Sequence, residues 1–228
     1  MSQADCTLVI PAYNEEARIG SLLEELSGFS GDLIFVCDGT DATSAVIGAF
    51  ADDHPSLRAR CLTFPSRLGK GGGIMAGIRE AQTPYIGYMD ADGSTSLSEM
   101  ERLFDRLAAV DGAIGSRWLP GSVLRARQGL RRRVESRLFN LIVRLLFGLD
   151  YRDTQCGAKV FRREALGAVI PSIRSTGFEF DVELLWRFRQ NGYRVEEIPI
   201  TWENQGESKV GAGDAEAMLR GMLRLRFG

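Results

Sequence analysis

Residues 85–100, YIGYMDADGSTSLSEM, join a short apolar run to two aspartates, a loop of small hydroxyl residues and the start of a helical pattern. Apolar runs of this length, bounded by turn residues, are typical of strands that are buried on both faces. Asp90 and Asp92 follow the run directly. Taken alone, the two acids are compatible with a metal and a phosphorylated substrate, with a ribose contact, or with a cap on the next helix.

The same order of apolar run and helical pattern recurs through the first half of the chain. Strands are predicted at 6–11, 33–37, 58–64, 85–89 and 112–116, and helices at 15–26, 41–51, 71–81 and 98–110. Continuous apolar strands separated by helices predict an α/β fold with a mostly parallel sheet that is covered on both faces. Ligands bind beyond the carboxyl ends of such strands. Three of these ends carry polar motifs: PAYNEE (11–16), CDGTDAT (37–43) and DADGST (90–95).

The second half has a different pattern. It predicts a long apolar helix at 134–149, a short strand at 159–161, a helix at 180–191, an edge strand at 195–200 and an amphipathic helix from 214. The chain contains no internal repeat or low-complexity tract. We therefore expect a single domain, residues 1–228, whose specialised second half begins at 117.

Composition narrows the function classes. The 228 residues carry a net charge of -2, which gives no overall attraction to nucleic acid. The four cysteines match no metal spacing, and His54 is the only histidine, so a zinc enzyme or a histidine-based hydrolase is not expected. No signal peptide precedes the first strand, and no apolar run approaches the roughly 20 residues that span a bilayer. These features predict a cytoplasmic protein whose membrane contact is peripheral.

A basic segment offers such a contact. Residues 123–144 contain seven arginines against one acid, Glu135. The helix that follows is apolar nearly all round, with only a narrow polar stripe of Arg137, Asn140 and Arg144. A helix of this kind is either core or interfacial, and arginines suit anionic head groups. We expect residues 125–149 to contact a membrane surface.

The aspartate pair fits a metal–diphosphate clamp, because Mg²⁺ and Mn²⁺ prefer oxygen ligands and take few carboxylates beside substrate phosphates. A dinucleotide fingerprint at Gly71-x-Gly73-x-x-Ala76 is disfavoured, because residues 65–68 separate it from the preceding strand. A Walker motif also fails, because no Ser or Thr follows Lys70. The remaining interpretation is a loop whose Arg67 and Lys70 approach a diphosphate beside a helix N-terminus.

Eight motifs then occur in the order used by one enzyme family: VIPAYNEE, VCDGTDAT, RLGKGGG, DADGST, GSRW, RDTQCGAKVFRREAL, FEFDVELLWR and GESKV. Over nearly its whole length the chain resembles the family 2 inverting glycosyltransferases of the Rossmann-like GT-A fold. The later motifs look most like polyprenyl-phosphate hexose synthases, which include dolichyl-phosphate glucose and dolichyl-phosphate mannose synthases. GKGGG, DADGST, RDTQCGAKVF and FDVELL resemble the glucosyl branch.

The resemblance implies a role for each matching residue. With Arg67 and Lys70 of the glycine loop, the nucleotide-sugar site would comprise Pro11, Tyr13, Glu15, Asp38, Asp90 and Gln155. The metal, Mg²⁺ or Mn²⁺, would be held by Asp90 and Asp92, with Ser94 where relatives often have a polar amide. The acceptor phosphate would meet Arg117, Arg132, Ser136, Ser208 and Lys209. Besides the aspartate pair, Asp153 and Asp181 are candidate catalytic, orienting acids.

The expected reaction is inverting, metal-dependent transfer of a hexose from a nucleotide sugar to a polyprenyl (dolichyl) phosphate. UDP-glucose is the preferred donor, with GDP-mannose and UDP-N-acetylglucosamine as alternatives. The protein would lie at the cytoplasmic face of a membrane. Two other functions stay open: a family 2 transferase with a saccharide acceptor in cell-surface polysaccharide synthesis, and a peripheral membrane protein without turnover. The oligomeric state is left open.

Overall fold

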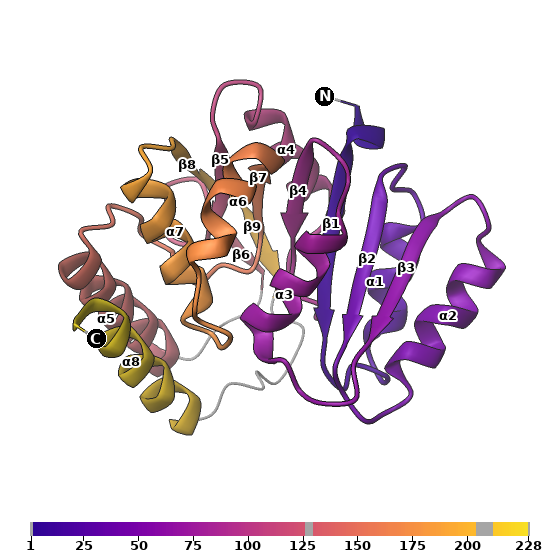
Figure 1. Ribbon diagram of the computed structural model, residues 1–228, viewed down its shortest axis with the longest axis horizontal. Coiled ribbons are helices and arrows are strands. Elements are labelled where there is room, and N and C mark those ends of the chain that lie inside the picture. The colour runs from indigo at the N-terminus through magenta and orange to yellow at the C-terminus, as the bar shows by residue number, and fades with distance from the viewer. Residues whose placement is uncertain (1, 126–129, 204–211, 228) are drawn as a thin grey trace.

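The computed structural model describes residues 2–125, 130–203 and 212–227, with side chains outside 126–138, 204–217 and 219. At its centre lies a seven-stranded sheet of order β3-β2-β1-β4-β7-β5-β8 (Figure 1). The strands are β1 Cys6–Ala12, β2 Asp32–Cys37, β3 Arg58–Thr63, β4 Tyr85–Tyr88, β5 Gly112–Ser116, β7 Lys159–Arg162 and β8 Val195–Pro199. Only β7 runs antiparallel to its neighbours, β4 and β5. The predicted mostly parallel α/β sheet is therefore confirmed.

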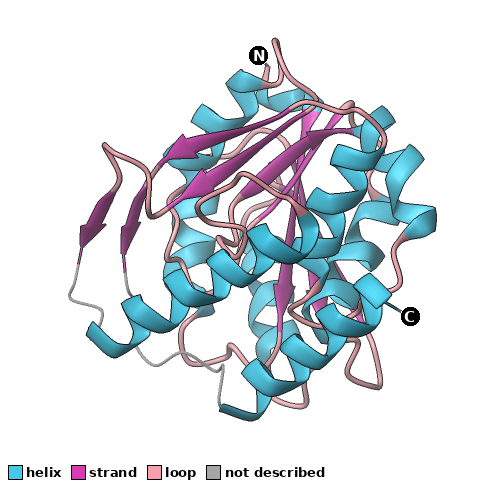
Figure 2. Cartoon of the chain, turned by 90° about the vertical axis from the view of Figure 1, so that its left-hand side faces the viewer, coloured by secondary structure: helices cyan, strands magenta, loops and turns pink. Residues whose placement is uncertain are grey.

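Helices cover both faces of the sheet (Figure 2). One face packs against α1 Ile19–Leu26, α2 Thr43–Asp53 and α4 Leu97–Arg106. The other packs against α3 Gly69–Glu80, α5 Leu130–Phe147, α6 Arg163–Val169, α7 Phe180–Gln190 and α8 Ala212–Phe227. Strand β1 serves both cores, because Leu8 and Ile10 point to the first and Val9 to the second. The described residues also form two short 3₁₀ helices, η1 Gln3–Asp5 and η2 Ile170–Ser172.

Some element boundaries differ from the sequence predictions. The helix predicted at 15–26 begins only at Ile19, and the one predicted at 134–149 ends at Phe147. Gly148 ends α5 because it adopts a left-handed conformation with φ of 66°. Helix α6 and a small parallel sheet of β6 Val123–Arg125 and β9 Thr201–Glu203 were not predicted. Strands of three residues are too short to carry a hydrophobic period.

The strand order creates the ligand-binding edge. Strands β1, β2 and β4 are parallel, so their carboxyl ends lie at the same edge of the sheet. The chain adds β2 and β3 on one side of β1, and β4 on the other. The crevice beyond β1 and β4 is therefore a topological switch point, where open α/β sheets bind ligands. The PAYNEE and DADGST motifs flank this crevice.

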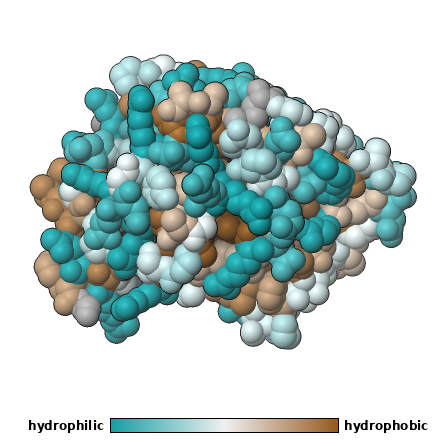
Figure 3. Space-filling view, turned by 45° about the horizontal axis from the view of Figure 1, so that its top comes forward, coloured by the Kyte–Doolittle hydropathy of each residue, from teal (hydrophilic) through white to brown (hydrophobic). Residues whose placement is uncertain are grey.

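Helices α5 and α8 lie side by side at one end of the molecule (Figure 1), and the Arg226 Nε donates to the Leu146 carbonyl at 2.9 Å. Each has a buried side, with Val143 on α5 and Met222 on α8. Each also exposes large apolar side chains: Leu141, Leu145, Leu223 and Phe227. In Figure 3, hydrophobic residues reach the surface at the edge where these helices lie. No helix in the described part of the chain is long and apolar enough to cross a membrane.

Candidate active site

Asp90 stands at the carboxyl end of β4 and points to Lys70, the second residue of α3. The Lys70 Nζ lies 2.8 Å from the Asp90 Oδ1, and the Asp90 side chain is 40% exposed. The opposite oxygen of Asp90 rests against Gly157. A Cβ at residue 157 would lie 2.0 Å from the Asp90 Oδ2, so only glycine leaves room for this carboxylate. The fold thus brings the first aspartate of the DADGST motif into contact with the lysine of the RLGKGGG motif.

Asp92 completes a pair of neighbouring carboxylates. The Ser94 backbone N–H donates to the Asp92 Oδ1 at 2.9 Å. Burial and the negative charge of Asp90 raise the pKa of Asp92, because both disfavour its ionised form. Ser94 itself is buried. Two oxygen-bearing groups of like charge, one of them open to solvent, fit a divalent cation such as Mg²⁺ or Mn²⁺.

The described residues supply few further ligands for such an ion. The described residues contain no group of three or more His, Cys, Asp or Glu side chains that could hold a metal. Mg²⁺ usually takes one or two carboxylates and fills its other positions with substrate phosphates and water. Asp90 and Asp92 therefore fit a metal that is shared with a phosphorylated ligand.

The ends of β1 and β2 are joined by side chains of the PAYNEE motif. Asn14 has a positive φ of 54°, and its Oδ1 accepts from the Thr40 N–H at 2.8 Å. Asn14 was not among the predicted site residues, although Asn is a common residue in this backbone conformation. The Arg67 guanidinium lies 4.0 Å from the centre of the Tyr13 ring, and the Asp38 Oδ2 accepts from the Leu68 N–H at 2.7 Å. Three of the predicted nucleotide-sugar residues thus lie at this edge.

Glu15 and Pro11 also lie at this edge. Pro11 is the second-to-last residue of β1 and is partly exposed. Glu15 is buried, and its carboxylate accepts from Arg18 in a bidentate ion pair. Its backbone N–H donates to the Thr43 Oγ1 at 2.8 Å. Glu15 therefore holds the turn between β1 and α1 to the start of α2.

Behind Asp90, a buried network surrounds Asp181 in the first turn of α7. The Asp181 Oδ1 accepts from the Tyr88 hydroxyl at 2.7 Å and from the Lys159 Nζ at 2.5 Å. The Asp181 Oδ2 lies 3.5 Å from the Lys70 Nζ. Burial opposes the ionised form of Asp181, but the charges of Lys159 and Lys70, with these hydrogen bonds, lower its pKa below the ordinary value.

Lys159 and Tyr88 were not predicted as site residues. Lys159 is fully buried in β7, and Tyr88 is buried in β4. A lysine within the apolar run that forms β7 was the available signal, because lysine is almost never fully buried unless it is paired. Burial also opposes the charge of Lys70, but Asp90 and Asp181 together raise its pKa above the ordinary value.

Arg117 and Asp153 form a second buried ion pair. The Asp153 Oδ2 accepts from the Arg117 N–H at 3.0 Å and from Nε at 2.7 Å, and Oδ1 accepts from Nη2 at 2.9 Å. Burial disfavours the charge on Asp153, but Arg117 outweighs it and lowers the pKa of Asp153. The two residues, predicted for separate roles, thus act on each other.

The residues after Asp153 connect this pair to α5. The Asn140 Oδ1 accepts from the Thr154 N–H at 3.0 Å and from the Thr154 Oγ1 at 2.9 Å. Asn140 is therefore buried, although the sequence placed it in the polar stripe of the helix. The next residue, Gln155, has a buried Nε2 with no hydrogen-bond partner among the described residues. A buried amide donor without a partner can donate a hydrogen bond to a polar ligand.

Four of the residues predicted to meet the acceptor phosphate have side chains outside the described residues. Arg132 and Ser136 belong to α5, but their side chains lie outside the described residues. Ser208 and Lys209 lie outside the described residues altogether.

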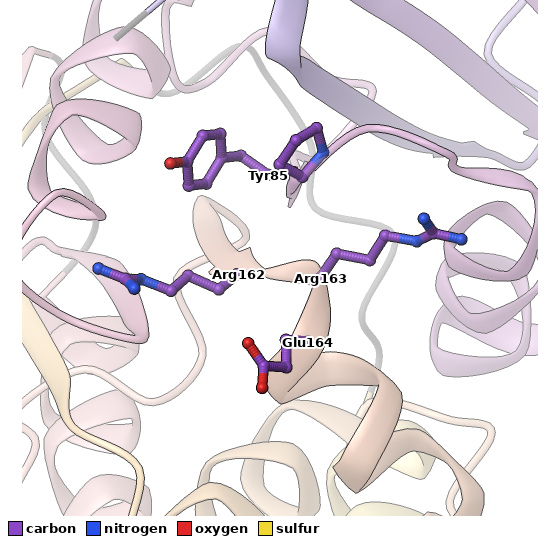
Figure 4. Close-up of a pocket in the computed structure, with 5 residues that line it drawn as sticks. Tyr85, Arg162, Arg163 and Glu164 are labelled. Carbon is purple, nitrogen blue, oxygen red and sulfur yellow. The ribbon is translucent and has the colours of Figure 1, made fainter.

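A cavity of about 490 Å³ lies at the opposite end of β4 (Figure 4). It is lined by Pro84, Tyr85, Arg162, Arg163 and Glu164. The side chains of its two arginines point apart (Figure 4), and both donate hydrogen bonds to other residues. The Arg162 Nε donates to the Leu107 and Val110 carbonyls, and Arg163 donates to Gln82. The cavity therefore offers no free guanidinium to an anion, and the crevice at Asp90 is the candidate site.

Comparisons with known proteins show which sequences this chain is similar to. Glycosyltransferase AglD of Haloferax volcanii is 35% identical over 219 residues, which are 90% of this chain and 34% of that protein. Polyprenol monophosphomannose synthase of Mycolicibacterium smegmatis is 33% identical over 225 residues, 93% of this chain and 84% of that protein. Dolichyl-phosphate beta-glucosyltransferase of Dictyostelium discoideum is 28% identical over 240 residues, 97% of this chain and 73% of that protein.

A solved structure supports the fold. Glucosyl-3-phosphoglycerate synthase from Mycobacterium tuberculosis, in complex with Mn²⁺, uridine diphosphate and phosphoglyceric acid, matches with a TM-score of 0.71 at 20% identity. The match covers 98% of this chain and 78% of that chain, and it confirms the predicted GT-A fold. Residues 7–170 match the family model described as Glycosyl transferase family 2. The protein is thus a glycosyltransferase, and the chain belongs to glycosyl transferase family 2.

Proposed function

We propose that this chain transfers a hexose from a nucleotide sugar to a polyprenyl phosphate, with inversion at the anomeric carbon. The observation that carries the proposal is that Asp153 and Asp181 are both buried and ion-paired. Neither offers an exposed carboxylate that could take a proton from an acceptor hydroxyl. A phosphate monoester, with a second pKa of about 6, is largely anionic at neutral pH and needs no such base. It needs positioning and charge screening.

The donor would lie across the crevice beyond β1, β2 and β4. Tyr13, Arg67 and Asp38 are proposed to contact the nucleoside, and Lys70 the diphosphate. UDP-glucose is the preferred donor, because the later motifs resemble the glucosyl branch and one relative is named a dolichyl-phosphate beta-glucosyltransferase. The relative named polyprenol monophosphomannose synthase keeps GDP-mannose as the alternative.

Asp90 and Asp92, with Ser94 beside them, are proposed to hold Mg²⁺ or Mn²⁺. When bound, the metal would neutralise the charge that develops on the departing nucleoside diphosphate. Lys70 and Arg67 would bind the same leaving group from the side of α3. Arg117 would orient Asp153, and through it residues 153–155, toward the acceptor.

The acceptor's lipid chain would reach the site along α5. Leu141 and Leu145 expose apolar surface there, Leu145 at 77%, and Arg144 lies between them. Apolar side chains beside arginines support the proposed contact of residues 125–149 with a membrane surface.

A single substitution tests the metal-binding role of Asp90. Gly157→Ala is expected to weaken Mn²⁺ binding about ten- to hundredfold, because its Cβ would displace the Asp90 carboxylate. Binding is measured by titration with Mn²⁺, with the free ion followed by electron paramagnetic resonance. Gly167→Ala in α6 is the matched control, because a Cβ there meets nothing within 4 Å. Unchanged Mn²⁺ affinity in Gly157→Ala would count against Asp90 as a ligand.

The reaction itself is tested with the full chain, Mg²⁺ or Mn²⁺, polyprenyl phosphate in mixed micelles and three nucleotide sugars: UDP-glucose, GDP-mannose and UDP-N-acetylglucosamine. We expect a lipid-linked hexose by mass spectrometry, formed fastest from UDP-glucose and with an inverted anomeric centre by nuclear magnetic resonance. Transfer from GDP-mannose alone would keep the reaction and change the sugar. Transfer only to a saccharide, or donor binding without turnover, would contradict the proposal.

A further inference from the structure

The Lys70 ammonium lies between two aspartate carboxylates, one partly exposed and the other buried. It is 2.8 Å from the Asp90 Oδ1 and 3.5 Å from the Asp181 Oδ2. The Asp90 side chain is 40% exposed, whereas Asp181 is buried. The backbone around Lys70 is fixed, because the next two N–H groups of α3, at Gly71 and Gly72, donate to the Gly177 and Thr176 carbonyls. Any change of partner must therefore come from the lysine side chain alone.

Asp181 has an oxygen atom that can accept a hydrogen bond from this side chain. One oxygen, Oδ1, is saturated by Tyr88 and Lys159. The other, Oδ2, is buried and has no hydrogen-bond partner among the described residues. A buried carboxylate oxygen without a hydrogen bond is costly, and the Lys70 ammonium lies only 3.5 Å from it. Tyr88 and Lys159 are thus positioning residues, which hold Asp181 so that its free oxygen faces Lys70.

The contact between Lys70 and Asp90 affects how a metal ion and a diphosphate would bind at this site. Asp90 and Asp92 bring two negative charges, and Lys70 contacts one of them directly. The neighbouring cation Arg18 is bound to Glu15 instead. A divalent cation on the aspartates would be repelled by Lys70, whereas a diphosphate would attract it. The contact between Lys70 and Asp90 therefore opposes binding of the metal alone and favours binding of metal and nucleotide together.

We propose that Lys70 competes with the metal for Asp90 and thereby couples metal binding to nucleotide binding. When both ligands bind, the ammonium shifts from Asp90 toward the Asp181 Oδ2 and the diphosphate. This inference rests on the proposed metal and donor site. It adds that Lys70 makes the metal bind more tightly when the nucleotide accompanies it than when the metal binds alone.

The test measures Mn²⁺ affinity with and without UDP, and in parallel with GDP, in the unaltered chain and in Lys70→Met, Lys70→Arg and Arg79→Gln. Lys70→Met is expected to bind Mn²⁺ alone about tenfold more tightly, and to lose about tenfold of the enhancement that the nucleotide gives. By linkage, the enhancement of nucleotide affinity by Mn²⁺ must fall by the same factor, which calorimetry measures independently. Lys70→Arg, which keeps the charge, should retain the coupling.

Arg79→Gln removes an exposed charge from the same helix and should change neither affinity. Thermal unfolding of each variant checks that the fold is kept. If the unaltered chain shows coupling and Lys70→Met shows the same coupling, the inference is wrong while the proposed metal site stands. If the unaltered chain binds no Mn²⁺ with either nucleotide, both fail. A chain that shows the coupling but transfers no hexose to polyprenyl phosphate would support the inference and refute the proposed acceptor.

Discussion

Replacing Asp90 or Asp92 by asparagine is expected to lower hexose transfer about 10²- to 10³-fold and to leave the fold intact. Asparagine keeps the shape of each side chain but removes the charge that a divalent cation and the departing diphosphate require. The fold should tolerate the change, because each substitution relieves repulsion between two neighbouring carboxylates and Asp90 is 40% exposed.

The measurement is the initial rate of transfer from UDP-glucose at several Mn²⁺ concentrations, with thermal unfolding of each variant. Asp53→Asn, at the exposed end of α2, is the matched control and should transfer at the normal rate. Near-normal transfer by both Asp90→Asn and Asp92→Asn would remove the aspartate pair from the mechanism. Loss of activity together with a lower unfolding temperature would instead assign them a structural role.

The position of this pair could be predicted from sequence because it depends on local patterns and on one general rule. The apolar runs of β1, β2 and β4 are each followed by polar motifs, and parallel strands bring such ends to one edge. The direct contact between Lys70 and Asp90, at 2.8 Å, was not predicted, because Lys70 lies in α3 rather than at the end of a strand.

The buried partners could not be predicted in this way. Asp181 meets Tyr88 across 93 residues of chain, and the hydroxyl of a tyrosine in an apolar run gives no sign of its partner. The antiparallel insertion of β7 between β4 and β5 brings Lys159 to the same place, and no local period indicates that order. The burial of Asn140 could not be predicted for a related reason, because its partner Thr154 lies in a turn outside the helix.

Breaking the ion pair of Arg117 and Asp153 is expected to reduce both stability and transfer. Arg117→Met is expected to lower the free energy of unfolding by about 3–5 kcal/mol, because it leaves the carboxylate of Asp153 buried and unpaired. Transfer should be lost as well, since residues 153–155 are then no longer held. Chemical denaturation of the variants gives the stability, and Arg106→Met is the control. Arg106 pairs with Glu196 at the surface, where such a pair contributes about 0.2–1 kcal/mol.

The double variant Arg117→Met with Asp153→Leu separates stability from function. It replaces both charges by apolar groups, so it should unfold at a higher denaturant concentration than Arg117→Met alone. It should still transfer no hexose, because the carboxylate that Arg117 orients is gone. Recovery of both stability and transfer in the double variant would show that the pair serves packing only. Recovery of stability without recovery of transfer would mean that the ion pair is needed for the reaction and not for stability.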